Sequence, residues 1–281
     1  MKDMISEDIK RINELISLTE EDNIGDYIDS TYLKTSEQAG ISDDETSRII
    51  TKTIQDAMDH NMKLVMIRPE FVGLADQMIK EYDSDLLVGT VIGFPSGDDW
   101  MGDKFDEALE AIRNNVDELD FVVNYKAFQK GDLDTIKKEV CEGTKIGVDG
   151  GKVVKWIIES AALTSEQIAD LTSLIRDIVI ECVGEQKAGN VFVKTSTGFY
   201  KPEDGRPGGA TVDDVSIMSL NAGPLKVKAS GGIYSREDLE KMVDAGASRI
   251  GTSAGLEIIK GEKLLKLYQY HTKVAEHYFC S

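Results

Sequence analysis

The stretch VFVKTSTGF, residues 191–199, joins a predicted strand to a polar loop. Val191, Phe192 and Val193 favour β structure and lack helical spacing, and the hydroxyl and glycine residues that follow them end the strand. Lys194 lies at the end of this apolar run, where its ammonium group would lose hydration. A protein keeps such a lysine when the charge is paired or when a lowered pKa is useful. The stretch therefore predicts a buried parallel strand with an unusual lysine at its carboxyl end.

Lys194 on its own allows two interpretations. An uncharged lysine amine attacks carbonyl carbons and forms a Schiff base. A lysine at a strand end more often extends its ammonium group to the loop surface, and for one lysine considered alone this is the commoner case. The rest of the chain has to decide between them.

Strand-like and helix-like segments alternate along the chain on both sides of this stretch. Further strands are predicted at residues 27–33, 63–67, 86–94, 119–123, 153–158, 225–229 and 248–252. Helical patterns lie between them, for example at residues 104–114, 165–180, 212–219 and 235–245. This repeated unit, without a change of composition, predicts an α/β protein with a TIM (β/α)₈ barrel. An open doubly wound sheet has the same alternation and remains the competing architecture.

A further helix is predicted before the first strand. Isoleucine and leucine residues recur at helical spacing within residues 4–18, with charged residues between them. We expect residues 1–26 to form an N-terminal helical extension and residues 27–281 to form a single barrel that carries the catalytic site.

The charge balance restricts the possible partners. The 281 residues include 32 Lys and Arg against 51 Asp and Glu, which gives a formal net charge of −19 at pH 7. Such a surface argues against nucleic acid or an anionic membrane as a partner. It also repels phosphorylated ligands at long range, so a phosphate site must be built locally from backbone amides, helix ends or a few cations.

The cysteines, histidines and apolar runs bear on compartment and cofactors. Cys141, Cys182 and Cys280 are scattered and lack metal-ligand spacing, which predicts reduced thiols and a cytoplasmic protein. No apolar run is long enough to span a membrane, and no signal peptide is recognisable. The 3 histidines do not form a metal-ligand pattern, so we expect catalysis by lysine and carboxylate groups without a metal.

Charged and hydroxyl side chains gather on the predicted strands, whose carboxyl ends form the active-site face of a TIM barrel. These residues are Asp29, Thr31, Asp120, Lys155, Glu159, Lys194 and Lys228. Taken singly, Asp29 or Glu159 is more often part of a structural ion pair. Burying several such groups without partners would cost several kcal/mol each, so together they predict a site.

Two lysines on adjacent strands suggest how an uncharged amine arises. A protonated Lys228 close to Lys194 would disfavour the ammonium form of Lys194, and loss of hydration would act in the same direction. The amine would then be free near neutral pH, as a Schiff-base nucleophile requires. Asp120 could hold the protonated Lys228 and pass protons, directly or through one water.

Two glycine-containing turns suggest a phosphate site. Residues 229–233 (ASGGI) follow the seventh predicted strand, and residues 251–255 (GTSAG) follow the eighth. In many barrels the loops at these two positions bind phosphate through backbone N–H groups. A single glycine pair would indicate no more than a tight turn, but both loops in these positions favour phosphate.

From Asp29 to Gly255 the chain resembles the deoxyribose-phosphate aldolase family, whose members are Schiff-base aldolases with a TIM-barrel fold. The segments that carry the resemblance are DSTYLK (29–34), VIGFP (91–95), DELD (117–120), KWIIE (155–159), VKTSTGF (193–199), VKASGG (227–232) and AGASRIGTS (245–253). The Lys-Thr-Ser-Thr-Gly sequence is the most specific of them, whereas the glycine turns alone would be weak.

The resemblance implies reversible cleavage of 2-deoxy-D-ribose 5-phosphate to D-glyceraldehyde 3-phosphate and acetaldehyde, a lyase reaction of deoxyribonucleotide catabolism. Lys194 would form the Schiff base, Lys228 would perturb it, and Asp120 would relay protons. No metal or organic cofactor is expected, and similar proteins are commonly homodimers. The residues expected to bind substrate are Asp29, Thr31, Lys155, Thr197, Gly231, Gly232 and Ser253.

Some positions depart from the family pattern. Ala254 replaces a second phosphate-binding serine of some relatives, and Met66 occupies a position that is often cysteine. Residues 200–207 make the loop after the Schiff-base strand longer than usual. That loop could cover the site or bring Lys201 or Arg206 to the phosphate, but an indifferent surface insertion is the simpler expectation.

Two other functions share most of these features. A related Schiff-base aldolase or transaldolase for another sugar phosphate would have the same barrel and the same lysine. A barrel that has lost catalysis could serve as a binding protein, although keeping Lys194, Lys228 and Asp120 together argues against it.

Overall fold

The strands close into a barrel. The computed structural model describes residues 23–261, and eight parallel strands follow one another around the barrel in chain order. They are β1 (Ile28–Thr31), β2 (Leu64–Ile67), β3 (Leu87–Ile92), β4 (Glu118–Val122), β5 (Val153–Ile157), β6 (Val191–Lys194), β7 (Lys226–Ser230) and β8 (Arg249–Thr252). Because β1 pairs with β8 as well as with β2, the open-sheet alternative is excluded and the predicted TIM barrel is confirmed.

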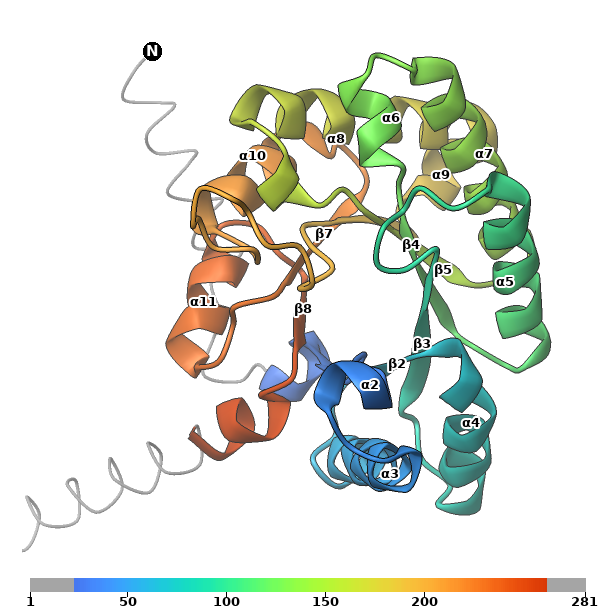
Figure 1. The fold of residues 1–281 in the computed structure, drawn as a ribbon, viewed down its shortest axis with the longest axis vertical. Helices are drawn as coiled ribbons and strands as arrows, with labels where there is room; N and C mark the ends of the chain where they lie inside the picture. The colour runs from blue at the N-terminus through green and yellow to red at the C-terminus, as the bar shows by residue number, and fades with distance from the viewer. Residues whose placement is uncertain (1–22, 262–281) are drawn as a thin grey trace, which may run out of the picture.

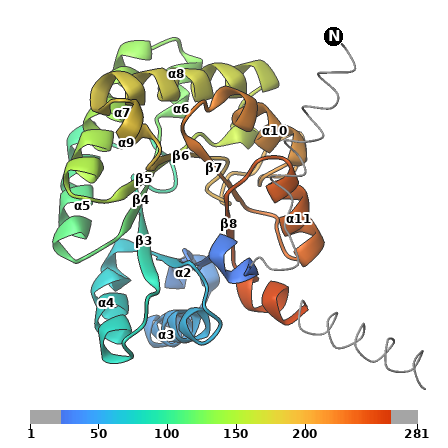
Figure 2. The same ribbon diagram turned by 180° about the vertical axis from the view of Figure 1, so that it is seen from behind.

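The helices form an outer layer around the strands, as both faces of the molecule show (Figures 1 and 2). They are α2 (Ser36–Ala39), α3 (Asp43–Asp59), α4 (Val72–Glu81), α5 (Met101–Arg113), α6 (Tyr125–Gln129), α7 (Leu133–Asp149), α8 (Ser165–Val183), α9 (Glu185–Ala188), α10 (Val212–Asn221) and α11 (Arg236–Asp244), with 3₁₀ turns η1 (Ile24–Tyr27), η2 (Pro69–Phe71) and η3 (Ser160–Ala162). The leader helix expected at residues 4–18 lies outside the described residues.

Side chains of the strands alternate between two cores. Phe121 and Trp156 point outward and stack at 4.9 Å between ring centroids, and the Trp156 indole donates to Thr144 of α7 at 3.0 Å. Their neighbours Asp120 and Lys155 point into the barrel, since successive residues of a strand face opposite sides. The outer core is therefore apolar, whereas the barrel interior must hold charge.

The interior itself has an apolar part beside β2 and β3. Leu33, Leu64, Met66 and Val91 form a small buried cluster there, which Phe199 partly covers. The charged side chains come from β1 and from β4 to β8. This division places the polar chemistry on one side of the barrel.

Two cysteines differ from the expectation of reduced thiols. Cys141 of α7 and Cys182 of α8 form a disulfide, with their Cα atoms 5.7 Å apart. The two residues are 41 positions apart in the sequence, and only the packing of α7 against α8 brings them within disulfide range. The prediction of free thiols was therefore wrong for this pair, and Cys280 lies outside the described residues.

No helix within residues 23–261 is long and apolar enough to cross a bilayer.

A buried ion pair joins α5 to α7 below the loop that follows β3. Lys104 and Glu139 are almost fully buried, and the lysine Nζ lies 2.5 Å from Glu139 Oε1. Lys104 also donates to the carbonyl groups of Gly97 and Val122, and Glu139 accepts from the Asn124 backbone N–H at 2.8 Å. The pair thus fixes two loops at the carboxyl ends of β3 and β4.

We expect Lys104→Met to lower the free energy of unfolding by about 3–5 kcal/mol, because it leaves a buried carboxyl group without its cation. Urea denaturation would measure the change. Lys52→Met is the matched control: it removes an exposed ion pair with Asp56 and should change stability by no more than about 0.5 kcal/mol. Equal effects of the two substitutions would contradict a special role for the buried pair.

Candidate active site

A network of charged side chains fills the part of the barrel interior that lies away from the apolar cluster at β2 and β3. The β-strands bring them together from six positions around the barrel, and all are buried. The network consists of Asp29 (β1), Glu118 and Asp120 (β4), Lys155 (β5), Lys194 (β6), Lys228 (β7) and Arg249 (β8).

Asp120 occupies the centre of this network. Its Oδ1 accepts a hydrogen bond from Lys155 Nζ at 2.7 Å. Its Oδ2 accepts from both Lys194 Nζ at 2.8 Å and Lys228 Nζ at 2.9 Å. The two lysines are register partners on adjacent strands, so their amino groups meet at one carboxylate oxygen.

A second layer of pairs lies below Asp120. Asp29 pairs with Lys228 at 2.5 Å and also accepts hydrogen bonds from Arg249. Glu118 pairs with Lys155 and, at 3.2 Å, with Arg249. Each of these three cations therefore contacts at least two carboxylates.

The network contains fewer acids than cations, and Lys194 has no carboxylate to itself. Three carboxylates face four cationic groups, and the carboxylate that pairs with Lys194 is Asp120, which also binds Lys155 and Lys228. With Lys194 uncharged, the remaining charges of the network balance. The arrangement thus selects Lys194 as the group that gives up its proton most readily.

The pKa values follow this geometry. Burial lowers the pKa of Lys194, the Asp120 carboxylate opposes this effect, the nearby Lys228 charge adds to it, and the resulting pKa is about 8. Burial acts on the pKa of Asp120 in the raising direction, but Lys155, Lys194 and Lys228 outweigh it and hold that pKa well below its usual range. Burial would also lower the pKa of Lys155, yet its carboxylate neighbours raise it above the ordinary value. Desolvation is thus the main cause of the Lys194 shift, and the predicted repulsion from Lys228 adds to it.

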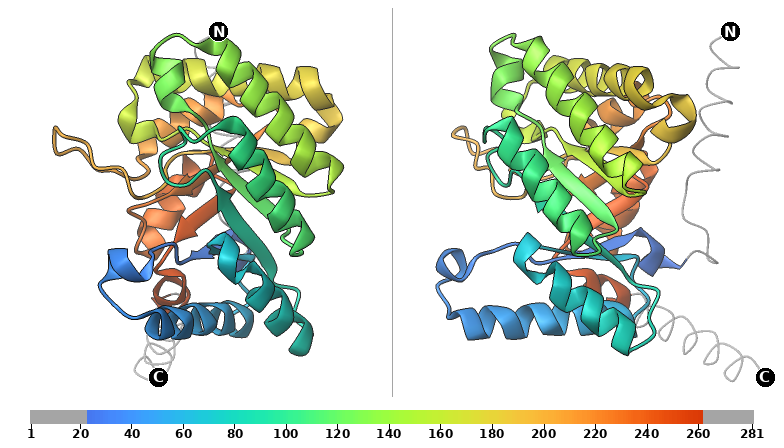
Figure 3. Two further views of the ribbon diagram at one scale, coloured as in Figure 1. Left: turned by 45° about the vertical axis from the view of Figure 1, so that its right-hand side comes forward. Right: turned by 90° about the vertical axis from the view of Figure 1, so that its right-hand side faces the viewer.

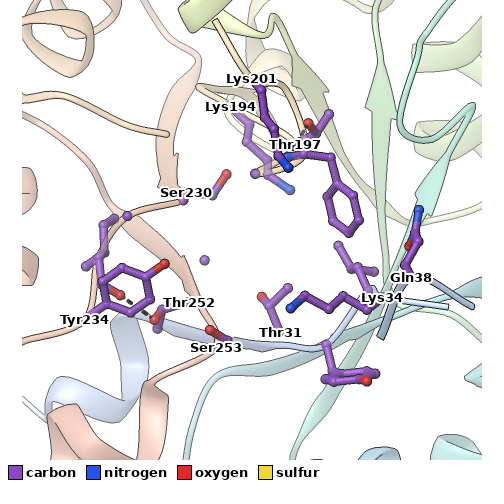
Figure 4. Close-up of a pocket in the computed structure, with 18 residues that line it drawn as sticks. Thr31, Lys34, Gln38, Lys194, Thr197, Lys201, Ser230, Tyr234, Thr252 and Ser253 are labelled. Atoms are coloured by element: carbon purple, nitrogen blue, oxygen red, sulfur yellow. Dashed lines mark hydrogen bonds between the residues drawn. The ribbon is translucent and has the colours of Figure 1, made fainter. Parts of the chain in front are cut away.

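A cavity of about 690 Å³ opens above the network (Figure 4). Lys194 lies on its wall, so the amine that most readily loses its proton is also the one that a ligand can reach. The other sequence-predicted residues that line the cavity are Thr31, Thr197, Gly231, Gly232 and Ser253.

Asp29 and Lys155 lie elsewhere than expected. Both were predicted to contact substrate, but both are fully buried below the cavity and do not line it. Asp29 is tied to Lys228 and Arg249, and Lys155 to Glu118 and Asp120. Their position suits them to fix the charges beneath Lys194.

The turn at Gly231 requires glycine. Its φ is +85°, and a Cβ atom there would come within 2.9 Å of the Gly209 Cα. The backbone N–H of Ala210 donates to the carbonyl groups of Ser230 and Gly231 at 3.1 and 3.0 Å. The end of the long loop after β6 is therefore attached to the glycine turn after β7, while its middle extends beyond the carboxyl ends of the strands (Figure 3).

Sequence reasoning missed several residues of this region. Those that line the cavity without a predicted role include Lys34, Gln38, Phe199 and Tyr234, and Glu118 and Arg249 were absent from the predicted network. Arg249 carried a usable signal, because a charged residue inside the predicted strand 248–252 needs a buried partner. The position of Lys34 depends on the turn after β1, which the alternation of strands and helices does not specify.

Lys34 and Lys201 bring positive charge to the cavity. In Figure 4 the Lys34 side chain extends into the cavity beside Thr31, and Lys201 approaches from the side of Lys194 and Thr197. Within residues 23–261 no carboxylate forms an ion pair with either lysine. The cavity therefore combines an amine of lowered pKa, two further cations and the glycine turns. No group of three or more possible metal-ligating side chains occurs in the described part of the chain.

Comparison with known proteins relates the chain to a family of aldolases. Residues 37–261 match the family described as DeoC/LacD family aldolase. A deoxyribose-phosphate aldolase of Staphylococcus carnosus is 40% identical over 236 residues, which are 84% of this chain and 94% of that protein. A deoxyribose-phosphate aldolase of a Thermoanaerobacter species is 40% identical over 247 residues, which are 87% and 99% of the two chains.

Solved structures give the same relation. The structure titled "QR15, an Aldolase" is 33% identical, has a TM-score of 0.69, and covers 89% of this chain and 99% of its own. The deoxyribose phosphate aldolase from Aeropyrum pernix, described as a unique tetramer, is 27% identical, has a TM-score of 0.69, and covers 90% and 97%.

The shared oxygen of Asp120 predicts how the pKa of Lys194 responds to Lys228. In Lys228→Leu, the repulsion disappears and Asp120 is shared by one cation fewer, so the pKa of Lys194 should rise from about 8 by roughly one unit. Competitive acetylation at a series of pH values, read by peptide mass spectrometry, would give the midpoint for Lys194.

Lys226→Leu is the control on the same strand, because the Lys226 ammonium lies over the Phe192 ring instead of at Asp120. It should leave the midpoint of Lys194 where it is. A midpoint that Lys228→Leu also fails to move would exclude electrostatic coupling of the two lysines.

Proposed function

Because the chain belongs to the DeoC/LacD family of aldolases, which act through a lysine Schiff base, we propose that this class I aldolase reversibly cleaves 2-deoxy-D-ribose 5-phosphate to D-glyceraldehyde 3-phosphate and acetaldehyde. The observation that carries the proposal is the Lys194 amine, which lies on the cavity wall and shares one Asp120 oxygen with Lys228. The named activity of the relatives supports the choice of substrate.

Lys194 supplies the covalent step. The neutral Nζ attacks the C1 aldehyde carbon of the open-chain sugar, and loss of water gives a protonated Schiff base. The C3 hydroxyl then loses its proton, the C2–C3 bond breaks, and its electron pair moves into the iminium nitrogen. This releases glyceraldehyde 3-phosphate and leaves an enamine on Lys194. Protonation of the enamine at C2 and addition of water release acetaldehyde and the free amine.

Asp120 is suited to move the protons. Its carboxylate lies 2.8 Å from the reacting nitrogen and 2.9 Å from Lys228 Nζ. Its low pKa keeps it ionised, so it accepts a proton only briefly and returns it directly or through one water. Lys228 keeps positive charge beside the reacting amine throughout.

The cavity walls provide for the phosphate and the sugar chain. We assign the phosphate to the backbone of Gly231 and Gly232 and to Ser253, with Lys34 and Lys201 as the nearby cations. These local groups are needed because the net charge of −19 repels a phosphorylated ligand at long range. Thr31 and Thr197 line the space between the phosphate turns and Lys194, where the sugar hydroxyls would lie.

The wider setting is also part of the proposal. We assign catalysis to one barrel domain, residues 27–281, working as a homodimer in the cytoplasm. A phosphorylated sugar does not cross membranes unaided, which supports a location where such sugars are made. The tetramer named for the Aeropyrum pernix protein supports self-association of this type of barrel. Light scattering would give the number of copies.

Incubation with acetaldehyde and sodium borohydride tests the covalent step. We expect peptide mapping to find an ethyl group on Lys194, because hydride reduces the Schiff base to a stable secondary amine. Lys194→Leu should abolish the adduct and the cleavage of deoxyribose 5-phosphate. An unmodified Lys194 would exclude the covalent mechanism, and a modified Lys194 with faster turnover of another sugar phosphate would correct the substrate.

The loop cation Lys201 gives a test of phosphate recognition. Lys201→Ala should raise KM for deoxyribose 5-phosphate about fivefold to tenfold, the equivalent of losing about 1.0–1.4 kcal/mol, and leave KM for unphosphorylated 2-deoxyribose unchanged. Arg206→Ala is the control in the same loop, since Arg206 is exposed and paired with Asp204. Steady-state kinetics that show equal losses for both sugars would exclude a phosphate contact by Lys201.

A further inference from the structure

Glu159 is a buried acid that the mechanism leaves without a task. It follows β5 directly, is 1% exposed, and has a left-handed backbone with φ +54°. The other described non-glycine residues with positive φ are Asn61, Asp83 and Asn115, which are of the types that adopt this conformation most readily. A glutamate held there is an exception, and the conformation directs its side chain toward the loop that follows Lys194.

The carboxylate of Glu159 is bound by a single neighbouring residue. The backbone N–H of Thr197 donates to its two oxygens at 3.3 and 3.4 Å, and the Thr197 hydroxyl donates to Oε2 at 2.5 Å. Within the described residues no cation forms an ion pair with it. In this respect Glu159 differs from Asp29, Glu118 and Asp120, which are all neutralised by lysine or arginine.

Thr197 connects Glu159 to the rest of the loop. Its hydroxyl oxygen also accepts from the Phe199 backbone N–H at 3.1 Å, and Phe199 packs edge-on against Phe94 with ring centroids 5.0 Å apart. Beside it, the Ser160 backbone N–H donates to the Thr195 carbonyl at 2.8 Å. The turn after the Schiff-base lysine is thus attached to the end of β5 on both sides of Ser196.

We propose that Glu159 is a positioning residue of the aldolase: its carboxylate holds the turn of residues 195–199, and protonation of Glu159 releases that turn and lowers activity. This inference rests on the proposed function. It assigns no contact with substrate to Glu159 itself, which acts through Thr197 on the cavity wall and on the direction of Lys194.

The hydrogen-bond chemistry explains why protonation would matter. An ionised carboxylate accepts hydrogen bonds from both donors of Thr197 at once. A protonated carboxyl group is also a donor, so it needs an acceptor nearby. The Thr197 oxygen already accepts from Phe199, so it is a poor recipient for that proton. One of the contacts must then weaken, and the turn loses its attachment.

The surroundings bring this protonation into the working pH range. Burial raises the pKa of Glu159, the two Thr197 donors and the Lys194 charge oppose this effect, and the resulting pKa is about 7. The other ionisable groups nearby are Tyr125 of α6, whose raised pKa partly reflects the Glu159 charge, and Asp214 of α10, which accepts from Ser160 Oγ at 2.9 Å. Both carry either no charge or a negative charge, so neither offsets the effect of burial.

The pH dependence of kcat/KM distinguishes this role from simple packing. With 2-deoxyribose as substrate, which has no phosphate to titrate, activity requires Lys194 without its proton and Glu159 ionised. The logarithm of kcat/KM should then fall with decreasing pH through the two pKa values, near 8 and near 7, and approach a slope of two below pH 6. Glu159→Gln has no carboxylate at any pH, so its kcat/KM should be lower throughout, and the slope should be one over the same range.

Thr197→Val provides a second variant that keeps Glu159. It removes the hydroxyl donor, so the pKa of Glu159 should rise and the lower break in the profile should move to higher pH. Glu107→Gln is the control for loss of a half-buried acid elsewhere, because Glu107 accepts from the Gly93 backbone N–H in another loop and should leave a slope of two.

The outcomes separate this inference from the function it rests on. A slope of one in the unaltered protein, or a slope of two that persists in Glu159→Gln, would exclude the positioning role. A lower break that Thr197→Val leaves in place would exclude it as well. If borohydride and acetaldehyde modify no residue at Lys194, the proposed function itself fails, whatever the slopes are.

Discussion

The charge balance of the barrel interior depends on one carboxylate oxygen that two lysines share. Asp120 Oδ2 binds Lys194 and Lys228 at nearly equal distances, but it carries at most one unit of charge and already forms part of a pair with Lys155. Two ammonium groups at one oxygen repel each other more than a single acid can compensate. Lys228 has Asp29 as a second acid, and Lys194 has none. The positions of the acids, as well as those of the lysines, therefore make Lys194 the one that loses its proton more readily.

The shape of the barrel makes this arrangement necessary. The outward faces of the strands pack against the helices, as Phe121 and Trp156 show, so the buried charged residues of the strands point inward. Inside, the apolar cluster near Met66 takes up the β2 and β3 side. The charges are confined to the remaining space, where they can be tolerated only as a nearly neutral set. Lys194 lies at the edge of that set and borders the cavity. Its side chain is therefore buried enough to lose hydration, yet a ligand in the cavity can reach it.

The sequence was sufficient for the barrel and for the three residues at the centre of the network. Alternating strands predict the fold because each βα unit is local, and Lys194 and Lys228 were conspicuous because charged residues interrupt apolar strands. The sequence did not predict that Asp29 and Lys155 lie below the cavity. Inward-facing residues two positions apart on a strand lie at different depths in the barrel, and those depths depend on how the neighbouring strands are staggered. The Cys141–Cys182 pair and the cavity residue Lys34 depend on helix packing and loop direction, which have no local signature. The sequence placed Glu159 among the charged residues at the strand ends, but its hydrogen bond with Thr197 depends on the three-dimensional structure.

The attachment of Gly209 and Ala210 to the turn at Gly231 has a consequence for how such an enzyme diversifies. Both ends of the segment between β6 and α10 are anchored, one by the Thr197 turn and the other by the glycine contact. Insertions and deletions between these anchors leave Lys194 undisturbed while they reshape the rim of the cavity, which Lys201 lines. Natural variation or laboratory selection confined to residues 200–208 can therefore alter which aldehydes are accepted without rebuilding the catalytic machinery.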